Sequence, residues 1–304
     1  MKTNVSFTSN GLKIAGHLYL PDGYKEGEKL PAIVTSHPFG GVKEQTAGLY
    51  AQKLADKGFV TLAFDASYQG ESEGEPRYLE DPFTRAEDIK SAVTFLANRA
   101  EVDAERIGAL GICASGGYVP YTAQTERRIK AVAAVSGADM GALFREGLGG
   151  GGSKEALQAM LEQSGKARTA EANGEPAHLE HIVPNTPGEI TKDTPTLYAE
   201  GTDYYRTPRA QHPNSPNWFV FRSVDRIAAY SSYDRVDLIS PHPLLMIAGT
   251  RADTRYFSEL AIEKAQEPKE LFLIEGASHI DLYDKEEYVG PAVEKLGSFF
   301  KQYL

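Results

Sequence analysis

The sequence is poor in cysteine, because its 304 residues contain a single one, Cys113. One cysteine excludes an intrachain disulfide and a metal site built from cysteines, and its thiol is easiest to keep reactive in a reducing compartment. No segment contains the roughly 18 consecutive apolar residues that a membrane-spanning helix needs, and the first residues lack the apolar run of a signal peptide. These absences predict a cytoplasmic protein that does not enter a membrane.

An excess of positive charge is also missing. The chain carries 32 basic and 42 acidic residues, for a net charge of −10, which argues against nucleic acid as the main partner. No dinucleotide fingerprint follows the first strand, no glycine-rich stretch ends as a P-loop does, and His178 and His181 have no evident third ligand. We therefore expect no cofactor and no metal, a small-molecule substrate as the partner, and a homodimer as an open alternative.

Apolar strands and helices alternate along most of the chain. An antiparallel hairpin is predicted near the start, and short apolar runs typical of buried strands follow at residues 30–36, 59–64, 107–110, 129–135, 243–249 and 270–274. Segments with helical spacing separate most of these runs. The pattern predicts an α/β fold of the doubly wound kind, with a mostly parallel sheet and helices on both faces.

The alternation stops after residue 136 and resumes near residue 238. The intervening residues 137–237 include a glycine-rich connector, a helical stretch, a proline-rich part and a cluster of aromatic side chains. We interpret them as a cap inserted between core segments 1–136 and 238–304. Candidates for substrate contacts are Tyr204 and Trp218 in this cap, and His37 and Tyr68 in loops that follow core strands.

The strand at 107–110 leads into Gly111-Ile-Cys113-Ala-Ser115-Gly-Gly. A strand, a sharp glycine-rich turn and a helix, with a nucleophilic side chain in the turn, form the nucleophile elbow of α/β-hydrolases. If Gly111 ends the strand, Cys113 occupies the exposed turn position; if the strand runs to Ile112, Ser115 is central. The first register places glycine where the backbone is most crowded. It favours Cys113, with Ser115 as the alternative nucleophile and a buried structural thiol as the plainer reading of Cys113.

Ligands of doubly wound sheets bind beyond the carboxyl ends of the strands. Asp253 follows the strand at 243–249, and His279 follows the last strand, so nucleophile, acid and histidine come in the order of α/β-hydrolases. The imidazole would take the thiol proton and the carboxylate would orient the ring. Asp139 is the alternative acid, since Asp253 could instead cap the next helix. A thiol at a helix N-terminus beside a histidine is expected to shift toward thiolate.

An oxyanion that forms during acyl transfer needs preorganised N–H donors. The Ala114 amide, directly after the nucleophile, is the first candidate. The second is expected from the loop His37-Pro-Phe-Gly-Gly, and we assign it to Phe39 because Pro38 has no N–H.

At this point four motifs carry a family resemblance: Ser-His-Pro-Phe-Gly-Gly-Val-Lys-Glu-Gln45, Phe-Asp-Ala-Ser-Tyr-Gln-Gly-Glu-Ser72, Gly-Ile-Cys-Ala-Ser-Gly-Gly117 and Gly-Ala-Ser-His-Ile-Asp-Leu-Tyr283. The chain resembles the dienelactone-hydrolase-like α/β-hydrolases and, more closely, the fungal polyketide transferase and thiohydrolase family with its bacterial relatives. The resemblance implies a Cys113–Asp253–His279 triad and ester or thioester substrates. Ser115 departs from the pattern, because many hydrolases have glycine there.

We therefore expect a hydrolase that cleaves carboxylic esters or thioesters through an acyl-enzyme intermediate. An acyltransferase that passes the acyl group to an alcohol or amine is the alternative within enzymes. A ligand-binding protein with a hydrolase fold and no activity is the alternative of another class, since a fold alone does not define a function.

Overall fold

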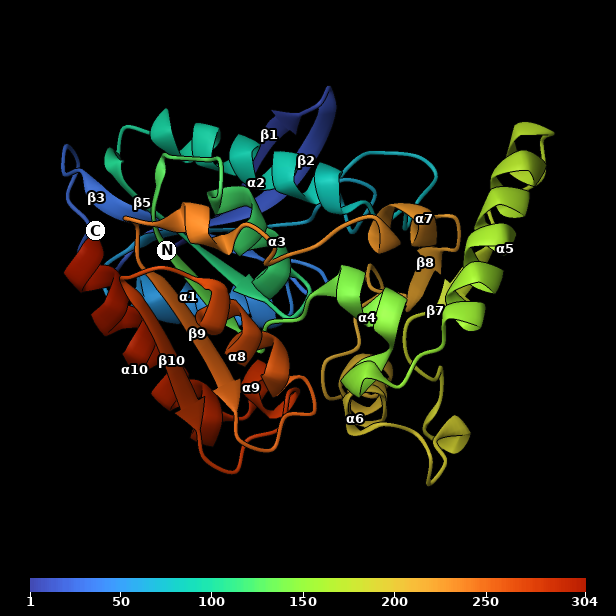
Figure 1. The fold of residues 1–304 in the computed structure, drawn as a ribbon. Helices are drawn as coiled ribbons and strands as arrows, with labels where there is room; N and C mark the ends of the chain where they lie inside the picture. The colour runs from blue at the N-terminus through green and yellow to red at the C-terminus, as the bar shows by residue number, and fades with distance from the viewer.

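An eight-stranded sheet forms the centre of the computed structural model, which describes residues 1–304 (Figure 1). In spatial order its strands are β1 (Lys2–Ser9), β2 (Leu12–Tyr19), β4 (Val60–Phe64), β3 (Leu30–Ser36), β5 (Val102–Ile112), β6 (Ile129–Val135), β9 (Leu244–Gly249) and β10 (Lys269–Ile274). The pairs β1–β2 and β2–β4 are antiparallel, and every other neighbouring pair is parallel. The predicted α/β-hydrolase fold with a mostly parallel sheet is confirmed.

The antiparallel hairpin β1–β2 closes through a two-residue turn at Asn10 and Gly11. Both residues have positive φ, 47° and 81°, and Ser9 pairs with Leu12 across the turn. Asn-Gly is the sequence that best tolerates this conformation, because a turn of this kind needs positive φ at both central positions.

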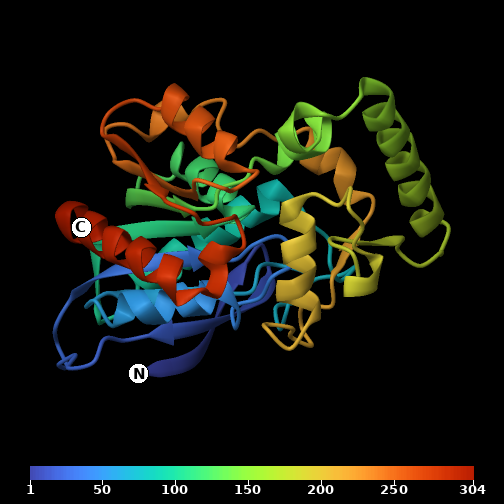
Figure 2. The ribbon, with the colours of Figure 1, turned by 90° about the horizontal axis from the view of Figure 1, so that it is seen from below.

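Helices cover both faces of the sheet (Figure 2). On one face lie α1 (Thr46–Ala55) and α10 (Glu286–Tyr303), and on the other lie α2 (Pro82–Ala97), α3 (Ser115–Ala123) and α8 (Arg255–Lys264). In α10, Val289, Val293, Leu296 and Phe300 are buried, at the three- and four-residue spacing that keeps side chains on one helix face. Two hydrophobic cores therefore enclose the sheet, one on each side.

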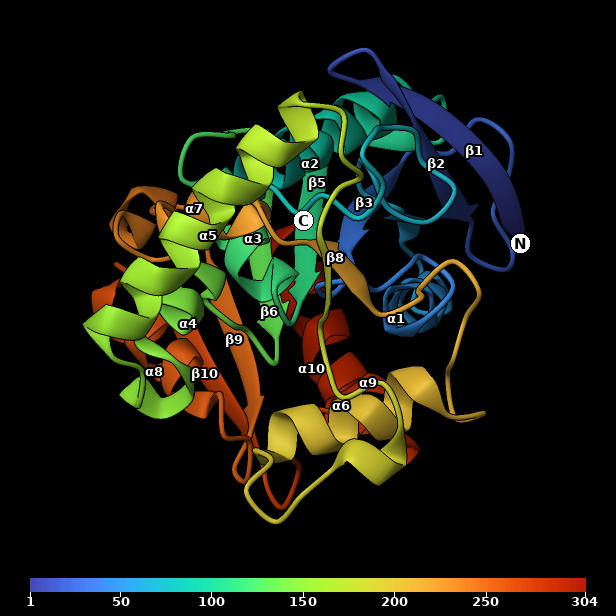
Figure 3. The same ribbon diagram turned by 90° about the vertical axis from the view of Figure 1, so that its right-hand side faces the viewer.

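Between β6 and β9 the chain leaves the sheet and builds a layer to one side of it (Figures 1 and 3). This cap consists of α4 (Met140–Glu146), η1 (Leu148–Gly150), α5 (Lys154–Ala172), β7 (Leu179–His181), η2 (Pro187–Glu189), α6 (Thr196–Arg206), β8 (Trp218–Val220), α7 (Ser223–Ala228) and η3 (Val236–Ile239). Strands β7 and β8 pair with each other and not with the central sheet. Helix α5 stands at the outer edge in Figure 1 and buries only Ser164 and Ala167. No helix is long and apolar enough to traverse a lipid bilayer.

Candidate active site

The turn after β5 holds Cys113 in a strained conformation. Strand β5 ends at Ile112, Cys113 has φ 57°, and α3 begins at Ser115. The Cys113 amide donates to the Val135 carbonyl at 3.1 Å, and the neighbouring β6 therefore holds the turn in place. A non-glycine residue in the left-handed region is costly and is typical of functional turns. The strand is one residue longer than the favoured register required, yet the sharp turn still falls on Cys113.

The small residues of the elbow are explained by close approach of backbones. A Cβ on Gly111 would lie 1.8 Å from the Ser115 carbonyl oxygen, and one on Gly116 would lie 2.5 Å from the Gly137 Cα atom. Helix α3 thus starts in contact with the strand that precedes it. Glycine at position 111 serves this packing from inside β5, which continues for one more residue to Ile112.

Ser115, the alternative nucleophile, is fully buried and points away from the cavity at Cys113. Its hydroxyl donates to the His37 carbonyl at 2.5 Å and accepts from the Arg85 guanidinium at 2.8 Å. Ser36 lies 2.9 Å away on the same side. The expectation that a strand running to Ile112 would make Ser115 central is not met, because the turn and not the strand end decides which side chain faces outward.

The Cys113 thiol lies at the base of an apolar cavity of about 60 Å³ between the core and the cap. Twelve of the 14 residues around this cavity are hydrophobic, so an apolar ligand group suits it best. The lining residues are Pro38, Phe39, Cys113, Ala138, Met140, Leu143, Ile182, Val183, Leu197, Tyr198, Gly201, Tyr205, Ile280 and Tyr283.

Three groups near the sulfur could donate a hydrogen bond to a thiolate: the Tyr283 hydroxyl and the backbone amides of Ala114 and Phe39. They favour the thiolate, but burial outweighs them and raises the pKa of the Cys113 thiol. The expected shift toward thiolate is therefore not found. The thiol is protonated at neutral pH because it is packed among apolar groups and has no hydrogen bond from a cation.

His279 lies in the loop after β10 and is 1% exposed. Its Nδ1 lies 2.5 Å from the Thr254 hydroxyl oxygen, and its Nε2 lies 3.2 Å from the Tyr283 hydroxyl. The Ser136 hydroxyl donates to the His279 carbonyl at 3.0 Å and holds the backbone of the loop. Burial lowers the pKa of His279 to about 3, so the ring is neutral at physiological pH and can accept a proton.

Neither candidate acid hydrogen-bonds to His279. The Asp253 carboxylate accepts from the Leu197 amide at 2.9 Å, in the first turn of cap helix α6, and its other oxygen is buried without a partner. Asp139 accepts from the amides of Ala142 and Ser232, each at 3.1 Å, and so caps α4. The hydroxyl of Thr254, next to Asp253 in the chain, occupies the position at Nδ1 where the carboxylate was expected.

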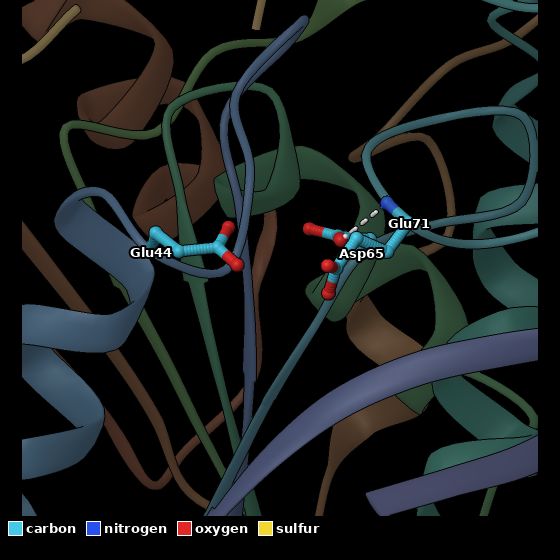
Figure 4. A group of neighbouring side chains, drawn as sticks. All are labelled: Glu44, Asp65 and Glu71. Atoms are coloured by element: carbon cyan, nitrogen blue, oxygen red, sulfur yellow. Dashed lines mark hydrogen bonds between the residues drawn. The ribbon is translucent and has the colours of Figure 1, made fainter. Parts of the chain in front are cut away.

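The loop that carries Phe39 is fixed by ion pairs of Lys43, whose side chain is buried. Its ammonium group lies 2.7 Å from Glu44, 2.8 Å from Asp65 and 2.7 Å from Glu71, and its amide donates to Asp65 at 2.8 Å. Figure 4 shows the carboxylates of these three residues close to one another. The lysine charge accounts for their proximity, so the cluster is a structural anchor of the loop and not an obvious metal site.

His37 belongs to the support of this loop and not to the cavity lining. Its Nδ1 donates to the Pro38 carbonyl at 2.7 Å, and its Nε2 accepts from the Ala66 amide at 3.1 Å. Arg85 of α2 donates to the His37 carbonyl at 2.5 Å and, as above, to Ser115. Both ring nitrogens of His37 are thus engaged within the protein, and substrate contact by this residue stays a prediction.

The other three expected substrate contacts also lie outside the cavity lining. Tyr68 adopts φ 70° in a turn beside Glu73. Tyr204 is 2% exposed and packs on Tyr283 with ring centroids 5.1 Å apart. Trp218 stacks on His181 at 3.9 Å on the cap surface. Two other tyrosines of α6, the helix that carries Tyr204, line the cavity instead: Tyr198 and Tyr205. The register of the helix decides which of its tyrosines face Cys113.

Three residues at the site were not singled out from the sequence: Thr254, Tyr283 and Arg85. Tyr283 follows His279 by four residues, a spacing that brings side chains together where the chain turns helically. Thr254 ends the segment that contains Asp253. The residues around Arg85 in the sequence do not indicate its role, because its partners His37 and Ser115 are distant in the chain.

The chain has relatives that match nearly all of it. The protein named YcjY of Escherichia coli (strain K12) is 40% identical over 100% of both chains. PA2218 of Pseudomonas aeruginosa is 40% identical over 97% of this chain and 78% of its own. The crystal structure of PA2218 has a TM-score of 0.93 at 38% identity and covers 100% of this chain and 94% of its own.

Relatives with named activities are more distant. Polyketide transferase grgF of Penicillium sp is 26% identical over 92% of this chain and 90% of its own. The crystal structure of GrgF, titled an alpha/beta hydrolase, shares the fold with a TM-score of 0.84 at 23% identity, covering 100% of this chain and 99% of its own. Other relatives are named as a thiohydrolase and an acyltransferase, so the homologues support an enzyme.

A family model described as X-Pro dipeptidyl-peptidase (S15 family) matches residues 10–221, more than half of the chain. Peptidases of that family use serine, whereas the elbow here holds Cys113. The predicted resemblance to α/β-hydrolases and to the fungal polyketide transferases is confirmed. The chain belongs to the S15 family, within the α/β-hydrolases.

Proposed function

We propose that the protein transfers acyl groups from thioesters or activated esters to water, with Cys113 as the nucleophile. One observation carries the proposal: the amides of Phe39 and Ala114 lie close enough to the Cys113 sulfur, at the strained turn, to pull the pKa of its thiol downward. Donors in this place would also face the oxygen of a carbonyl group that the sulfur attacks. Such preorganised donors are the largest single contribution to catalysis in many acyl-transfer enzymes.

In the resting state neither the thiol nor the imidazole is charged, so the proton has to move as the sulfur attacks. The thiol is protonated and the imidazole is neutral, because burial raises the pKa of Cys113 and lowers that of His279. Transfer of the thiol proton to His279 as the sulfur attacks the carbonyl carbon gives a tetrahedral intermediate. The imidazolium protonates the leaving thiol or alcohol as this intermediate collapses to the acyl-enzyme. Water activated by the neutral imidazole releases the acid.

Thr254, and not Asp253, is proposed to orient His279. Its hydroxyl oxygen lies 2.5 Å from Nδ1 and would accept the Nδ1 proton, which leaves Nε2 free to act as the base. Asp253 instead ties cap helix α6 to the core through the Leu197 amide. In this proposal the carboxylate positions the cap over the cavity.

The cavity favours an uncharged apolar acyl group. No acidic or basic side chain lines it, whereas the substrate of an X-Pro dipeptidyl-peptidase presents an N-terminal ammonium group that needs a negative partner. Sulfur nucleophiles also react more readily with thioesters than with amides. A peptidase activity is therefore not the one we propose for this member of the S15 family.

Transfer of the acyl group to an alcohol or amine is the second candidate. It is favoured by the apolar cavity under the cap, which limits access of water to the acyl-enzyme. The name of the relative grgF, a polyketide transferase, points the same way. The two candidates share every step up to the acyl-enzyme.

A panel of acyl esters, acyl thioesters and lactones, assayed with wild type, Cys113→Ala and Ser115→Ala, tests the proposal. We expect turnover of short apolar acyl thioesters, its loss in Cys113→Ala, and its retention in folded Ser115→Ala. Mass spectrometry of the trapped protein should find the acyl group on Cys113. Retained activity in Cys113→Ala would refute the assignment, and product analysis with added alcohol separates hydrolysis from transfer.

A further inference from the structure

Tyr283 lies between the proposed nucleophile and the proposed base. It belongs to the short helix α9 (Asp281–Asp284), is 1% exposed, and lines the same cavity as Cys113. Its hydroxyl lies 3.2 Å from His279 Nε2 and is near enough to the Cys113 sulfur to pull the pKa of the thiol downward, against the effect of burial. The two hydrogen bonds of the imidazole go to Thr254 and Tyr283, and neither goes to the sulfur. The tyrosine hydroxyl thus adjoins both the imidazole and the cavity that holds the sulfur.

The tyrosine ring is held rigidly by its neighbours. It meets Tyr204 edge to face with centroids 5.1 Å apart and an interplanar angle of 88°, and it meets Tyr205 at 6.3 Å and 81°. Aromatic pairs of this kind restrict the ring to one orientation. The hydroxyl therefore remains directed at both reacting groups without a further loss of conformational entropy during the reaction.

The hydroxyl keeps its own proton. Burial raises the pKa of Tyr283 well above its ordinary value, so a tyrosinate does not form at neutral pH. A hydroxyl of this kind passes a proton on only by accepting one while it donates another. It has one proton to donate and lone pairs to accept with, which matches the thiol on one side and Nε2 on the other.

We propose that the Tyr283 hydroxyl relays the proton between Cys113 and His279. In the forward step the S–H bond breaks, its proton joins the tyrosine oxygen, and the original hydroxyl proton moves to Nε2. The sulfur electron pair forms the bond to the carbonyl carbon of the substrate. Nδ1 keeps its proton, directed at Thr254. When the tetrahedral intermediate collapses, the proton returns from Nε2 through the tyrosine oxygen to the leaving group, so charge and protons balance.

This inference rests on the proposed function, and the test separates the two. The variants are Tyr283→Phe, Cys113→Ala and, as the matched control, Tyr230→Phe. Tyr230 is also buried, its hydroxyl makes no hydrogen bond, and it does not line the cavity. Initial rates are measured with p-nitrophenyl acetate and with a short acyl thioester. We expect Tyr283→Phe to lower kcat/KM by about 100-fold to 10,000-fold, the range of general acid–base catalysis, and Tyr230→Phe to stay near wild type.

Solvent isotope effects distinguish a relay from a structural role. A relay moves two protons in one step, so kcat/KM of the wild type should depend on the deuterium fraction of the solvent along a bowl-shaped curve. In folded Tyr283→Phe the residual rate should follow a straight line. A merely structural tyrosine would leave the dependence linear in both proteins.

Each remaining outcome has one reading. If Tyr283→Phe retains wild-type kcat/KM while Cys113→Ala is inactive, the relay is overturned and the proposed function stands. If Cys113→Ala retains wild-type turnover, the proposed function fails and the relay fails with it. If Tyr283→Phe does not fold, the dependence of wild-type kcat/KM on the deuterium fraction of the solvent decides. A bowl-shaped curve supports the relay, and a straight line refutes it.

Discussion

Acidification is expected to destabilise the protein through His279, and replacing this residue by glutamine should remove that part of the pH dependence. His279 is neutral in the folded protein because burial lowers its pKa to about 3. In the unfolded chain the same side chain binds a proton below its ordinary pKa of 6.5. Since the unfolded state binds more protons, stability falls as the pH falls. The contribution of the neutral His279 ring to the free energy of unfolding is intact above about pH 7 and is lost progressively between pH 6.5 and about pH 3.

The size of the effect follows from linkage. Each pH unit over which only the unfolded chain is protonated costs about 1.4 kcal/mol. At a pH of about 5, some 1.5 units below the unfolded pKa, the loss is about 2 kcal/mol. The figure is insensitive to the folded pKa, because any value below about 4 leaves His279 almost unprotonated at this pH.

Urea unfolding at pH 7.5 and pH 5, followed by far-ultraviolet circular dichroism, measures the effect in wild type and His279→Gln. The other histidines, including buried His37, are common to both proteins and cancel in the comparison. Wild type should lose about 2 kcal/mol more than the variant between the two conditions. An equal loss in both proteins would mean that His279 is protonated freely in the folded state, and the account of its burial would be refuted.

Four further predictions concern the site and its supports. Iodoacetamide should alkylate Cys113 slowly at pH 6 and faster as the pH rises toward 9 and beyond, because burial raises the thiol pKa. Thr254→Val should lower kcat/KM by up to about 100-fold through misorientation of the imidazole, and Thr254→Ser should restore most of it. Asp253→Asn should change kcat less than about tenfold, because it keeps an oxygen for the Leu197 amide, whereas a triad aspartate costs about 10,000-fold when replaced by asparagine. Lys43→Met should destabilise the protein by about 3–5 kcal/mol, because Asp65 is left buried and charged.

Each of these predictions has a result that would contradict it. Rapid alkylation at pH 6, independent of pH, would indicate a thiolate–imidazolium pair at Cys113. A 10,000-fold loss in Asp253→Asn with an active Thr254→Val would restore the carboxylate to the triad. The control for Lys43→Met is Lys53→Met, whose ion pair with Glu286 is more exposed; it should change stability by less than about 1 kcal/mol. Equal losses in the two lysine variants would contradict the role given to burial.

Much of the core could be predicted because its pattern is local. Buried strands of a parallel sheet appear as continuous apolar runs, and α10 shows the spacing of an amphipathic helix. The turn at Asn10 and Gly11 is specified by the two residues themselves. The small residues of the elbow predict the sharp turn at Cys113, although β5 ends at Ile112, one residue later than the favoured register requires. The reason for glycine at position 111 is the close approach of α3 to β5, which is visible only in the folded backbone.

What the sequence alone determined is therefore the order of the elements, the parallel sheet, and the presence of Cys113 and His279 beyond its strands. Only the tertiary structure decided which groups meet there. Thr254 lies at the imidazole, Tyr283 lies beside the sulfur, and the Asp253 carboxylate binds the Leu197 amide of the cap. The physical reason is that periodicity specifies which face of an element is buried, through many weak and redundant contacts. A hydrogen bond depends on the position of a few atoms to within less than an ångström, and loops distant in the chain set those positions.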